Sequence, residues 1–397
     1  MANFLFFIPP HFGHINPTLG IGAALIARGH RVTWMGFRDV SIDIFPNSAE
    51  YYFPEEFRQE ANLVNSILYR QDEAAKNTAN KMIKWAFEST WLPFCHLTMK
   101  YLPDILERLK PDVIFHDEGL VGAAICAHQM GIPYATSISS APGLYYPAAQ
   151  VLLPEDAEWL KYTMSEIKQK YSVISNDEIL NSPKVNIVYT AKQFVFGNSF
   201  PSNYYFVGPA LDGRPEKTRF DWSVIDTTHI NLKKIYVSTG SLLKDVKQAF
   251  YQKVIDAFAN SNITVLVTAD PTLFESWPSN FIPRSFWPQL EVISRVDLVV
   301  TPCGFNTLNE SLYFGKPLLA IPMANDQFGN GNLVEQQGCG LKLRFRRLTV
   351  DQLKETVERL LTEEKFSTTA KKIGAALKQS GGSKRGAELL ESLINNN

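Results

Sequence analysis

The chain has 397 residues, of which 45% are hydrophobic and 20% charged, and its 39 Lys and Arg residues almost balance its 40 Asp and Glu residues. This composition is typical of a folded globular protein and argues against disorder, and the length allows two or three domains of roughly 150 residues. The net charge of −1 leaves no basic excess for nucleic-acid phosphates. We interpret the most basic run, 344–347, as an exposed strand end.

The cysteines and the apolar N-terminus bear on the cellular compartment. No two cysteines form a Cys-x-x-Cys pair, which argues against a zinc or redox site and suits a reducing compartment. The four are Cys95, Cys126, Cys303 and Cys339. The apolar run 4–8 has no basic segment before it and is followed by prolines, so we expect no signal peptide. No apolar run approaches the ~20 residues of a membrane helix, and we expect a cytoplasmic enzyme of small molecules.

Strands and helices alternate in the first half of the chain. A strand over 3–8 leads through a loop to a helix that Asn16 caps, with Pro17 at its first position. A strand over 31–35 completes a β-loop-α-β unit, which is typical of a parallel sheet. The series continues with a helix over 102–109, a strand over 112–116 followed by Asp117, a helix over 120–130 and a strand over 134–138.

An aromatic-rich helical segment interrupts this series between about 55 and 102. Its aromatic residues are Phe57, Tyr69, Trp85, Phe87, Trp91, Phe94 and Tyr101. They fit a pair of packed amphipathic helices, and some of them equally fit the lining of an apolar substrate pocket. Both interpretations stay open from the sequence.

A second series of strands and helices follows a polar stretch. We expect strands over 234–238, 263–268, 298–301 and 318–321, and helices over about 246–260, 307–314 and 349–361, the last capped by Thr349. The predicted fold is therefore α/β, with two Rossmann-like doubly wound domains facing each other across a cleft. The predicted domains are 1–208 and 223–380, joined by a linker over 209–222, with a C-terminal helix within 381–397.

One segment of the second half suits a phosphate group. Residues 301–310 follow a strand and open a helix, whose N-terminus offers backbone N–H groups and the positive end of the dipole. Gly304 allows close approach of a ligand to the backbone. The same segment also fits a capping box, Thr307-x-x-Glu310, and both interpretations stay open locally.

Other ligand motifs are missing from the sequence. It contains no P-loop and no Asp-x-Asp pair for a metal-bridged diphosphate. The Gly20-Ile21-Gly22 run falls inside a predicted helix rather than at a strand–helix turn, which argues against an NAD site. We therefore expect no metal.

Six motifs occur in a fixed order along the chain. They are Gly13-His14-Ile15-Asn16-Pro17, the strand-end Asp117, Ser238-Thr239-Gly240-Ser241, Phe286-Trp287-Pro288-Gln289, the helix start from Gly304 to Glu310, and Asp326-Gln327. The ordered set resembles the nucleotide-sugar-dependent glycosyltransferase superfamily of plant UGTs and bacterial macrolide and natural-product glycosyltransferases. The resemblance covers most of the chain and implies the GT-B fold, with the C-terminal helix packed back on the first domain.

The resemblance implies donor-binding roles in the second domain. Phe286 would stack on the nucleobase, the Trp287 backbone would bond the base edge, and Glu310 would accept hydrogen bonds from ribose hydroxyls. The diphosphate would contact Ser241, Gly304, Asn306 and Thr307, the donor sugar would contact Asp326 and Gln327, and Gln289 belongs to the same site. The co-substrate is then a nucleotide-diphosphate sugar, with UDP favoured, and no further cofactor is expected.

One position departs from the pattern of this superfamily. Pro302 stands where relatives have a histidine that donates to a donor phosphate. Proline offers neither a side-chain donor nor a backbone N–H, so a charge-assisted contact of nominally ~1.5–3 kcal/mol is lost. We expect weaker or rearranged donor binding as a result.

The resemblance implies that His14 is the general base and Asp117 its partner. A helix N-terminus keeps a nearby imidazole neutral, and a carboxylate stabilises the imidazolium that forms on proton uptake. His11 is the rival candidate, and we interpret it as a loop residue near the site. The other histidines are interpreted as structural or surface residues: His30, His96, His116, His128 and His229.

We therefore expect an inverting, metal-independent hexosyltransferase that glycosylates an apolar or aromatic small molecule, such as a natural product or antibiotic. It would act as a monomer or homodimer, with no nucleic-acid partner and no membrane span. Two alternatives stay open. Pro302 favours a catalytically lapsed binding or accessory protein, and sugar-nucleotide epimerases, which need no acceptor, share the same architecture.

Overall fold

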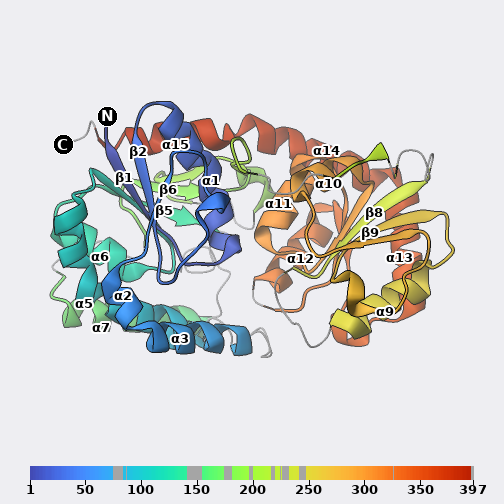
Figure 1. The fold of residues 1–397 in the computed structure, drawn as a ribbon, viewed down its shortest axis with the longest axis horizontal. Helices are drawn as coiled ribbons and strands as arrows, with labels where there is room; N and C mark the ends of the chain where they lie inside the picture. Colours follow the sequence, from blue (N-terminus) through green and yellow to red (C-terminus); the bar gives the residue numbers. More distant parts are fainter. Residues whose placement is uncertain are drawn as a thin grey trace. The chain divides into compact units, whose positions relative to one another are not determined.

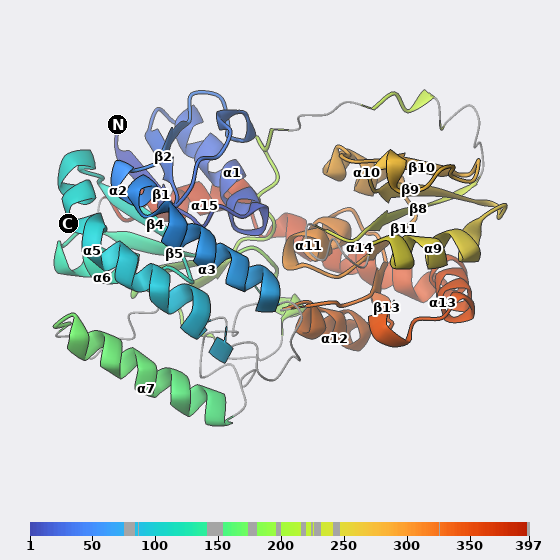
Figure 2. The same ribbon diagram turned by 60° about the horizontal axis from the view of Figure 1, so that its bottom comes forward.

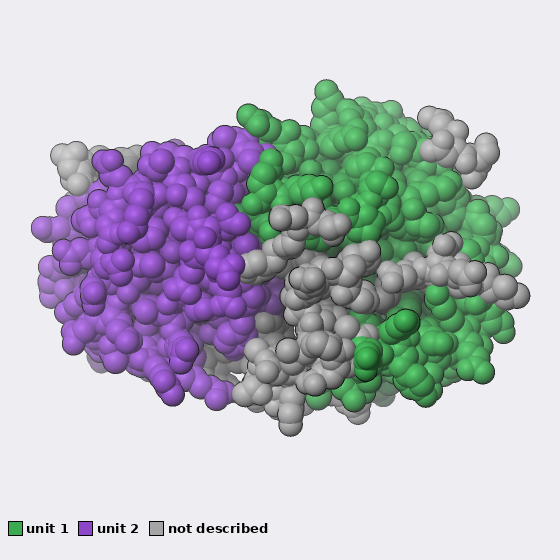
Figure 3. Space-filling view, turned by 180° about the vertical axis from the view of Figure 1, so that it is seen from behind, with its two compact units in different colours: residues 1–215, 379–397 green, residues 216–378 purple. Residues whose placement is uncertain are grey.

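The computed structural model describes two compact units, each with its own sheet (Figure 1). Unit 1 comprises residues 1–215 and 379–397, and unit 2 comprises residues 216–378 (Figure 3). The division at 215/216 falls inside the stretch expected to be a linker. The described residues are 1–74, 84–85, 87–140, 154–173, 181–195, 200–215, 220–223, 225, 232–240, 247–324 and 326–394.

The described strands of unit 1 form one parallel sheet in the order β3-β2-β1-β4-β5-β6-β7. They are β1 (Asn3–Phe7), β2 (Arg31–Met35), β3 (Glu50–Tyr52), β4 (Val113–Asp117), β5 (Tyr134–Ile138), β6 (Val185–Val188) and β7 (Tyr204–Phe206). The central strands are almost continuously apolar and buried, as expected of a parallel sheet covered on both faces.

Helices cover both faces of this sheet (Figure 2). They are α1 (Phe12–Ala27), α2 (Glu55–Gln59), α3 (Ala61–Ala74), α5 (Leu92–Leu109), α6 (Val121–Gln129), α7 (Pro154–Lys170) and α15 (Gly382–Glu391), with a π-helical turn at Phe87–Trp91 and 3-10 turns at Ile42–Ile44 and Lys192–Phe194. Because side chains alternate along a strand, Leu5 and Phe7 of β1 enter a core with α2, α3, α5, α6 and α7. Phe4 and Phe6 enter a second core, with α1 and α15.

Helix α1 begins earlier than its sequence predicts. The prediction placed Asn16 as the cap and Pro17 first, but α1 begins at Phe12 and both residues lie inside it. The reason is that the His11 carbonyl already accepts hydrogen bonds from the amides of His14 and Ile15, both at 2.9 Å. His14 is therefore the third residue of the helix rather than a loop residue.

The C-terminal helix α15 packs along α1 within unit 1 (Figure 1). Gly386 lies so close to Ile21 that a Cβ at this position would approach the Ile21 side chain to 2.4 Å. At the end of α1, Arg28 pairs with Glu391, and the same carboxylate accepts from His30 at 3.0 Å. Apolar burial and ion pairing together hold α15 on unit 1.

The described strands of unit 2 also form a parallel sheet, in the order β10-β9-β8-β11-β12-β13. They are β8 (Lys233–Ser238), β9 (Ile263–Thr268), β10 (Phe281–Arg284), β11 (Leu298–Thr301), β12 (Leu318–Ala320) and β13 (Gly340–Lys342). The accompanying helices are α9 (Lys247–Phe258), α10 (Gln289–Arg295), α11 (Phe305–Tyr313), α12 (Gln327–Gln337), α13 (Val350–Thr362) and α14 (Glu364–Gln379), with 3-10 turns at Pro271–Leu273 and Phe345–Arg347.

Two local predictions in unit 2 have different outcomes. Thr349 caps α13 as predicted, with a complete capping box that pairs it with Gln352. The basic run 344–347 is exposed for the most part but is not a strand end, because β13 ends at Lys342 and residues 345–347 form a 3-10 turn.

Both sheets have the strand order of a doubly wound Rossmann fold, so the fold class predicted for each domain is confirmed. In unit 1 the order reverses between β1 and β4, and in unit 2 between β8 and β11. Ligands of such sheets bind beyond the carboxyl ends of the strands at this reversal. No helix among the described residues is long and apolar enough to cross a membrane.

Candidate active site

In unit 1, two predicted residues meet where the strand order reverses. β1 leads into α1, which carries His14 in its first turn, and Asp117 is the last residue of β4. Because β1 and β4 are neighbours in the parallel sheet, their carboxyl ends lie at the same edge. The sheet topology thus brings together His14 and Asp117, which are 103 positions apart in the sequence.

His14 and Asp117 form a direct hydrogen bond of 2.8 Å between Nδ1 and Oδ2. The Asp117 side chain is completely buried, whereas that of His14 is 21% exposed. An ionised carboxylate only accepts hydrogen bonds, so Nδ1 carries the proton of a neutral His14 and Nε2 is the basic nitrogen. The pair has the arrangement of a general base with its orienting carboxylate.

Asp117 is held ionised despite its burial. Burial alone raises the pKa of this carboxyl, but the positive charge of protonated His14 and hydrogen bonds from His14, Gly119 and Ser139 lower the pKa below its ordinary value. The Gly119 amide donates to Oδ1 at 3.1 Å, and the Ser139 hydroxyl donates to Oδ2 at 3.0 Å. Both carboxylate oxygens are therefore fixed.

The residues on either side of Asp117, in contrast, are uncharged at neutral pH. Burial lowers the pKa of His116 to about 4, and its Nδ1–H donates to the carbonyl of Asp117 at 2.9 Å. Burial, followed by the negative charge of Asp117, raises the pKa of Glu118 to about 8. At neutral pH the strand end therefore carries a single charge, on Asp117.

Aromatic rings border His14. The rings of Trp91 and His11 lie with centroids 5.9 and 6.1 Å from that of His14. His11 is the N-cap residue of α1, next to the site, as its sequence interpretation placed it. A Cβ at Gly13 would meet nothing within 4 Å, so neither packing nor a positive φ requires glycine beside His14.

The aromatic segment between 55 and 102 packs mainly inside unit 1. Phe57, Phe87 and Phe94 are at most 2% exposed and belong to the core that also contains Leu5 and Phe7 of β1. Trp91, which is 5% exposed, is the member that contacts His14. The packed-helix interpretation therefore holds for these three phenylalanines; the Tyr69 side chain lies outside the described residues.

In unit 2, α11 follows β11 where the strand order reverses. Its N-cap is Gly304, where a Cβ would meet no atom of the described residues within 4 Å. The capping-box interpretation of Thr307 and Glu310 is wrong, since α11 begins at Phe305 and Thr307 already lies within its first turn. Cys303, just before it, has a left-handed backbone with φ of 72°.

Several predicted donor-site residues interact with one another. Glu310 is 2% exposed and accepts from the Gln289 amide at 2.5 Å, and the same Gln289 nitrogen lies 3.4 Å from the Thr307 hydroxyl. This groups Gln289, the first residue of α10, with Thr307 and Glu310 of α11. Asn306 is the second residue of that helix.

The nucleobase motif divides into an exposed and a buried aromatic residue. Phe286 is 74% exposed, and its ring is accessible to a planar ligand. Trp287 is 7% exposed and its indole N–H donates to the Val267 carbonyl at 2.9 Å, so its side chain anchors the loop. Ser241 lies outside the described residues.

The Asp326-Gln327 pair is fixed at the start of α12. The amide oxygen of Gln327 accepts from the backbone N–H groups of Met323 and Ala324, both at 2.9 Å. Asp326 accepts from Asn330 at 2.9 Å, and Asn330 also donates to the Cys303 carbonyl at 3.0 Å. Asn330, which sequence reasoning missed, thereby ties the start of α12 to the loop that precedes α11.

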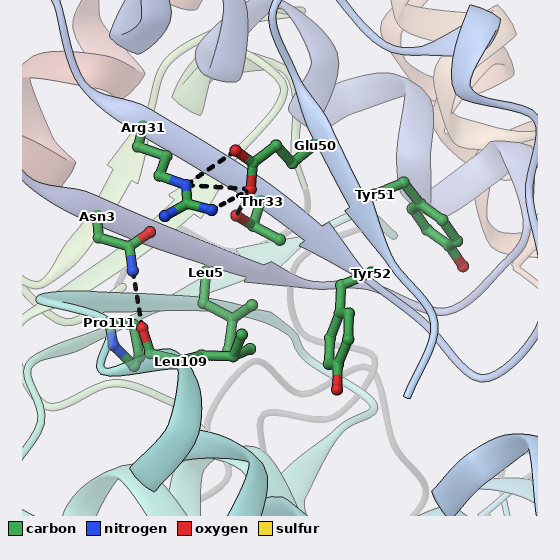
Figure 4. Close-up of a pocket in the computed structure, with 9 residues that line it drawn as sticks. All are labelled: Asn3, Leu5, Arg31, Thr33, Glu50, Tyr51, Tyr52, Leu109 and Pro111. Carbon is green, nitrogen blue, oxygen red and sulfur yellow. Dashed lines mark hydrogen bonds and ion pairs between the residues drawn. The ribbon is translucent and has the colours of Figure 1, made fainter. Parts of the chain in front are cut away.

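A cavity of about 170 Å³ lies elsewhere in unit 1 (Figure 4). Its lining includes Asn3, Arg31 and Glu50, which begin β1, β2 and β3, so it opens at the amino ends of the strands. Arg31 and Glu50 are paired there at 2.7 Å. His14 and Asp117 lie at the opposite, carboxyl edge, and the cavity includes none of the predicted site residues.

Comparison with known proteins finds similarity to glycosyltransferases. Residues 270–385 match the glycosyltransferase family 28 C-terminal domain. The chain is 27% identical to the uncharacterized UDP-glucosyltransferase YojK of Bacillus subtilis (strain 168), covering 99% of this chain and 98% of YojK. It is 26% identical to the oleandomycin glycosyltransferase of Streptomyces antibioticus, covering 98% and 90%. The solved glycotransferase of kitacinnamycin aligns with a TM-score of 0.76 at 21% identity, covering 99% of both chains.

Proposed function

We propose that the chain is a member of the superfamily of nucleotide-sugar-dependent glycosyltransferases, which its similarity to them and its GT-B fold support, and that it is an inverting, metal-independent hexosyltransferase. The donor is a nucleotide-diphosphate sugar, with a UDP-sugar favoured. The acceptor is a hydroxyl group of an apolar or aromatic small molecule such as a natural product. Unit 1 binds the acceptor and unit 2 binds the donor.

The observation that carries this proposal is the hydrogen bond between His14 and Asp117 at the carboxyl edge of the unit 1 sheet. Nε2 of His14 takes the proton of the acceptor hydroxyl while that oxygen attacks the anomeric carbon. The bond from that carbon to the diphosphate breaks in the same displacement, which inverts the configuration. Asp117 stabilises the imidazolium that results.

Four features of unit 2 support its role in holding the donor. The N-terminus of α11 is the positive end of the helix dipole. A leaving diphosphate bound there is stabilised without a metal. Gly304 leaves this approach open. The exposed ring of Phe286 suits stacking on a base, and the buried carboxylate of Glu310 suits ribose hydroxyls.

The names of the relatives support the finer assignments. YojK is named a UDP-glucosyltransferase, which favours a UDP-linked hexose. The oleandomycin and kitacinnamycin enzymes are named for natural products, which favours an acceptor of that kind. All four cysteines are buried free thiols, in keeping with a reducing cytoplasm. A monomeric or homodimeric state stays a prediction.

His14→Ala tests the mechanism. With UDP-glucose and a phenolic acceptor, we expect kcat to fall about 10²–10⁴-fold, the usual contribution of a general base. Product formation is followed by chromatography. The matched control is His128→Ala, which removes an exposed imidazole near the end of α6 and should leave kcat unchanged. Transfer by His14→Ala at the wild-type rate would show that His14 is not the base.

The same assay separates the two alternatives. A catalytically lapsed protein, which Pro302 favours, binds nucleotide sugars but transfers none of them to any acceptor. An epimerase releases an altered free nucleotide sugar in the absence of acceptor. Accumulation of glycosylated acceptor that depends on His14 supports the proposed function over both.

A further inference from the structure

Two consecutive serines face two consecutive acidic residues at the carboxyl edge of the unit 1 sheet. Asp117 ends β4, and the chain continues with Glu118, whose amide donates to the Ser137 carbonyl at 3.0 Å. Ser139 and Ser140 directly follow the neighbouring strand β5. Ser139 donates to Asp117 at 3.0 Å, and Ser140 donates to Glu118 at 2.7 Å. Each serine thus serves one carboxyl group.

Ser139 also contacts the imidazole, whereas no described contact joins Ser140 to it. The Ser139 Oγ lies 2.9 Å from His14 Nδ1 and 3.0 Å from Asp117 Oδ2, and those two atoms are 2.8 Å apart. The three atoms therefore form a closed triangle. Ser139 is 7% exposed, so its hydroxyl is fixed by these contacts rather than by bulk water.

The protons of this triangle have one favourable arrangement. Ser139 has one hydroxyl proton, which it donates to the carboxylate, so an Oγ lone pair faces Nδ1. Asp117 Oδ2 faces Nδ1 with a lone pair as well. A bare Nδ1 would oppose the lone pair of Asp117 Oδ2 at 2.8 Å even if Ser139 turned its proton to Nδ1, and the carboxylate would then lose the Ser139 donor; an Nδ1–H instead donates towards both oxygens. That tautomer leaves the lone pair on Nε2, where a general base needs it.

Ser139 also completes the fixation of the carboxylate. The Gly119 amide holds Oδ1 and the Ser139 hydroxyl holds Oδ2. Without the hydroxyl, Asp117 is anchored by one backbone group and by the imidazole that it is meant to orient. A buried carboxylate has no bulk water to replace a lost donor.

We propose that Ser139 is a positioning residue that holds His14 in the Nδ1–H tautomer through its joint contact with His14 and Asp117. The inference rests on the proposed role of His14 as base, and it adds a third residue to that pair. Ser139 acts through His14 and does not itself meet the substrate.

The test compares Ser139→Ala with the matched control Ser140→Ala. Both remove one hydroxyl from adjacent positions, but only the first opens the triangle. We expect Ser139→Ala to lower kcat about tenfold, the rate equivalent of one lost hydrogen bond, with both KM values unchanged. Ser140→Ala should match the wild type, because the Ser140 amide still donates to Glu118 at 3.0 Å. Ser139→Thr, which keeps the hydroxyl, should restore most of kcat.

A spectroscopic measurement makes the result independent of turnover. In protein labelled with ¹⁵N-histidine, the His14 signals, assigned by their loss in His14→Ala, should show a single Nδ1–H tautomer in the wild type and a mixture in Ser139→Ala. Equal tautomer populations in both proteins would overturn the role of Ser139. Absence of transfer by the wild type would overturn the proposed function instead, and the tautomer comparison would still decide the inference. Thermal unfolding confirms folding, and Ser139→Cys replaces the alanine variant if that variant does not fold.

Discussion

At the scale of the residue, Pro302 is the position of the proposed donor site that departs from the pattern of the superfamily. It is buried in the loop between β11 and α11, directly before the left-handed Cys303. At this position a histidine side chain could donate to a phosphate held at the helix start, and proline cannot. The opening left by Gly304 and the dipole of α11 remain, so donor binding is weakened rather than removed in the proposed function.

Restoring the histidine should therefore strengthen donor binding. We expect Pro302→His to lower the KM for UDP-glucose about tenfold or more, since a charge-assisted hydrogen bond contributes about 1.5–3 kcal/mol. Steady-state kinetics at saturating acceptor measure this change. Pro302→Ala is the control, because it removes the ring without adding a donor. The same KM in both variants would argue that no phosphate approaches this position.

The charge of a buried side chain depends on its immediate partners. This is seen in three consecutive residues, His116, Asp117 and Glu118. All three are buried, yet at neutral pH only Asp117 is ionised in the folded protein. The difference follows from their partners. Asp117 receives His14 and two further donors, whereas Glu118 receives Ser140 alone and lies beside a negative charge.

Glu118 should therefore make unit 1 less stable as the pH rises from about 4.5 to about 8. In that range the unfolded carboxyl, with an ordinary pKa of 4.5, has lost its proton, whereas the folded one, with a pKa raised to about 8, retains it. Proton loss then favours unfolding, by up to about 1.4 kcal/mol per pH unit. Urea unfolding of the wild type and of Glu118→Gln should show their difference in stability shrinking or reversing along this range.

His116 supplies an internal comparison with the opposite sign. Its folded pKa of about 4 lies below the ordinary 6.5, so its contribution to stability is present above pH 6.5 and lost as the pH falls to about 4. In Glu118→Gln, the free energy of unfolding should therefore rise with pH between about 4 and 6.5 because of His116. In the wild type the opposite effect of Glu118 partly cancels this rise. Parallel stability curves for the two proteins would contradict the raised pKa of Glu118.

At the scale of elements, the capping rules placed one helix start correctly and two too late. α13 begins one residue after Thr349, as predicted, and it has a full capping box. In α1 and α11 the N-cap residues are His11 and Gly304, and neither makes a side-chain capping bond. The capping rules instead selected polar residues inside these helices, so both predicted starts were too late. These two helices are the ones that carry His14 and the proposed diphosphate contacts.

The strands that the sequence did not predict lie mainly at sheet edges. β3, β7, β10 and β13 end their sheets, are three or four residues long and are only partly buried. An edge strand lacks the continuous apolar run of a central one, and β10 even tolerates Pro283 because its outer side needs no ladder bond. In β6 the buried Asn186 interrupts the apolar pattern and instead bonds neighbouring carbonyls.

The contact between α1 and α15 allows a direct test of packing. A Cβ at Gly20 would lie 2.3 Å from Ser383 Oγ and 2.5 Å from the Ala210 carbonyl oxygen. We expect Gly20→Ala to lower the free energy of unfolding of unit 1 by about 1–3 kcal/mol through overpacking, although alanine favours helices. Gly329→Ala, where a Cβ meets nothing within 4 Å in α12, should instead stabilise by up to about 1 kcal/mol. Thermal unfolding of both variants measures the contrast.

For the whole molecule, the sequence predicted the two doubly wound sheets because the central strands of each carry clear apolar runs. It placed His14 and Asp117 together only through a resemblance, since nothing local relates residues 103 apart. Ser139 and Glu118 were missed because a serine or glutamate after a strand is common. Their roles depend on which strand lies next in the sheet, and strand order is a property of the fold.

The return of the chain to unit 1 after residue 378 has a consequence for biosynthesis. During translation α1 leaves the ribosome before unit 2 is made, but the helix that covers its outer face leaves only after unit 2. Unit 2 is complete before that helix emerges and can fold as soon as it is released. Unit 1 must wait with Ile21, Leu25 and their neighbours uncovered. Unit 1, whose synthesis begins before that of unit 2, is thus completed after it.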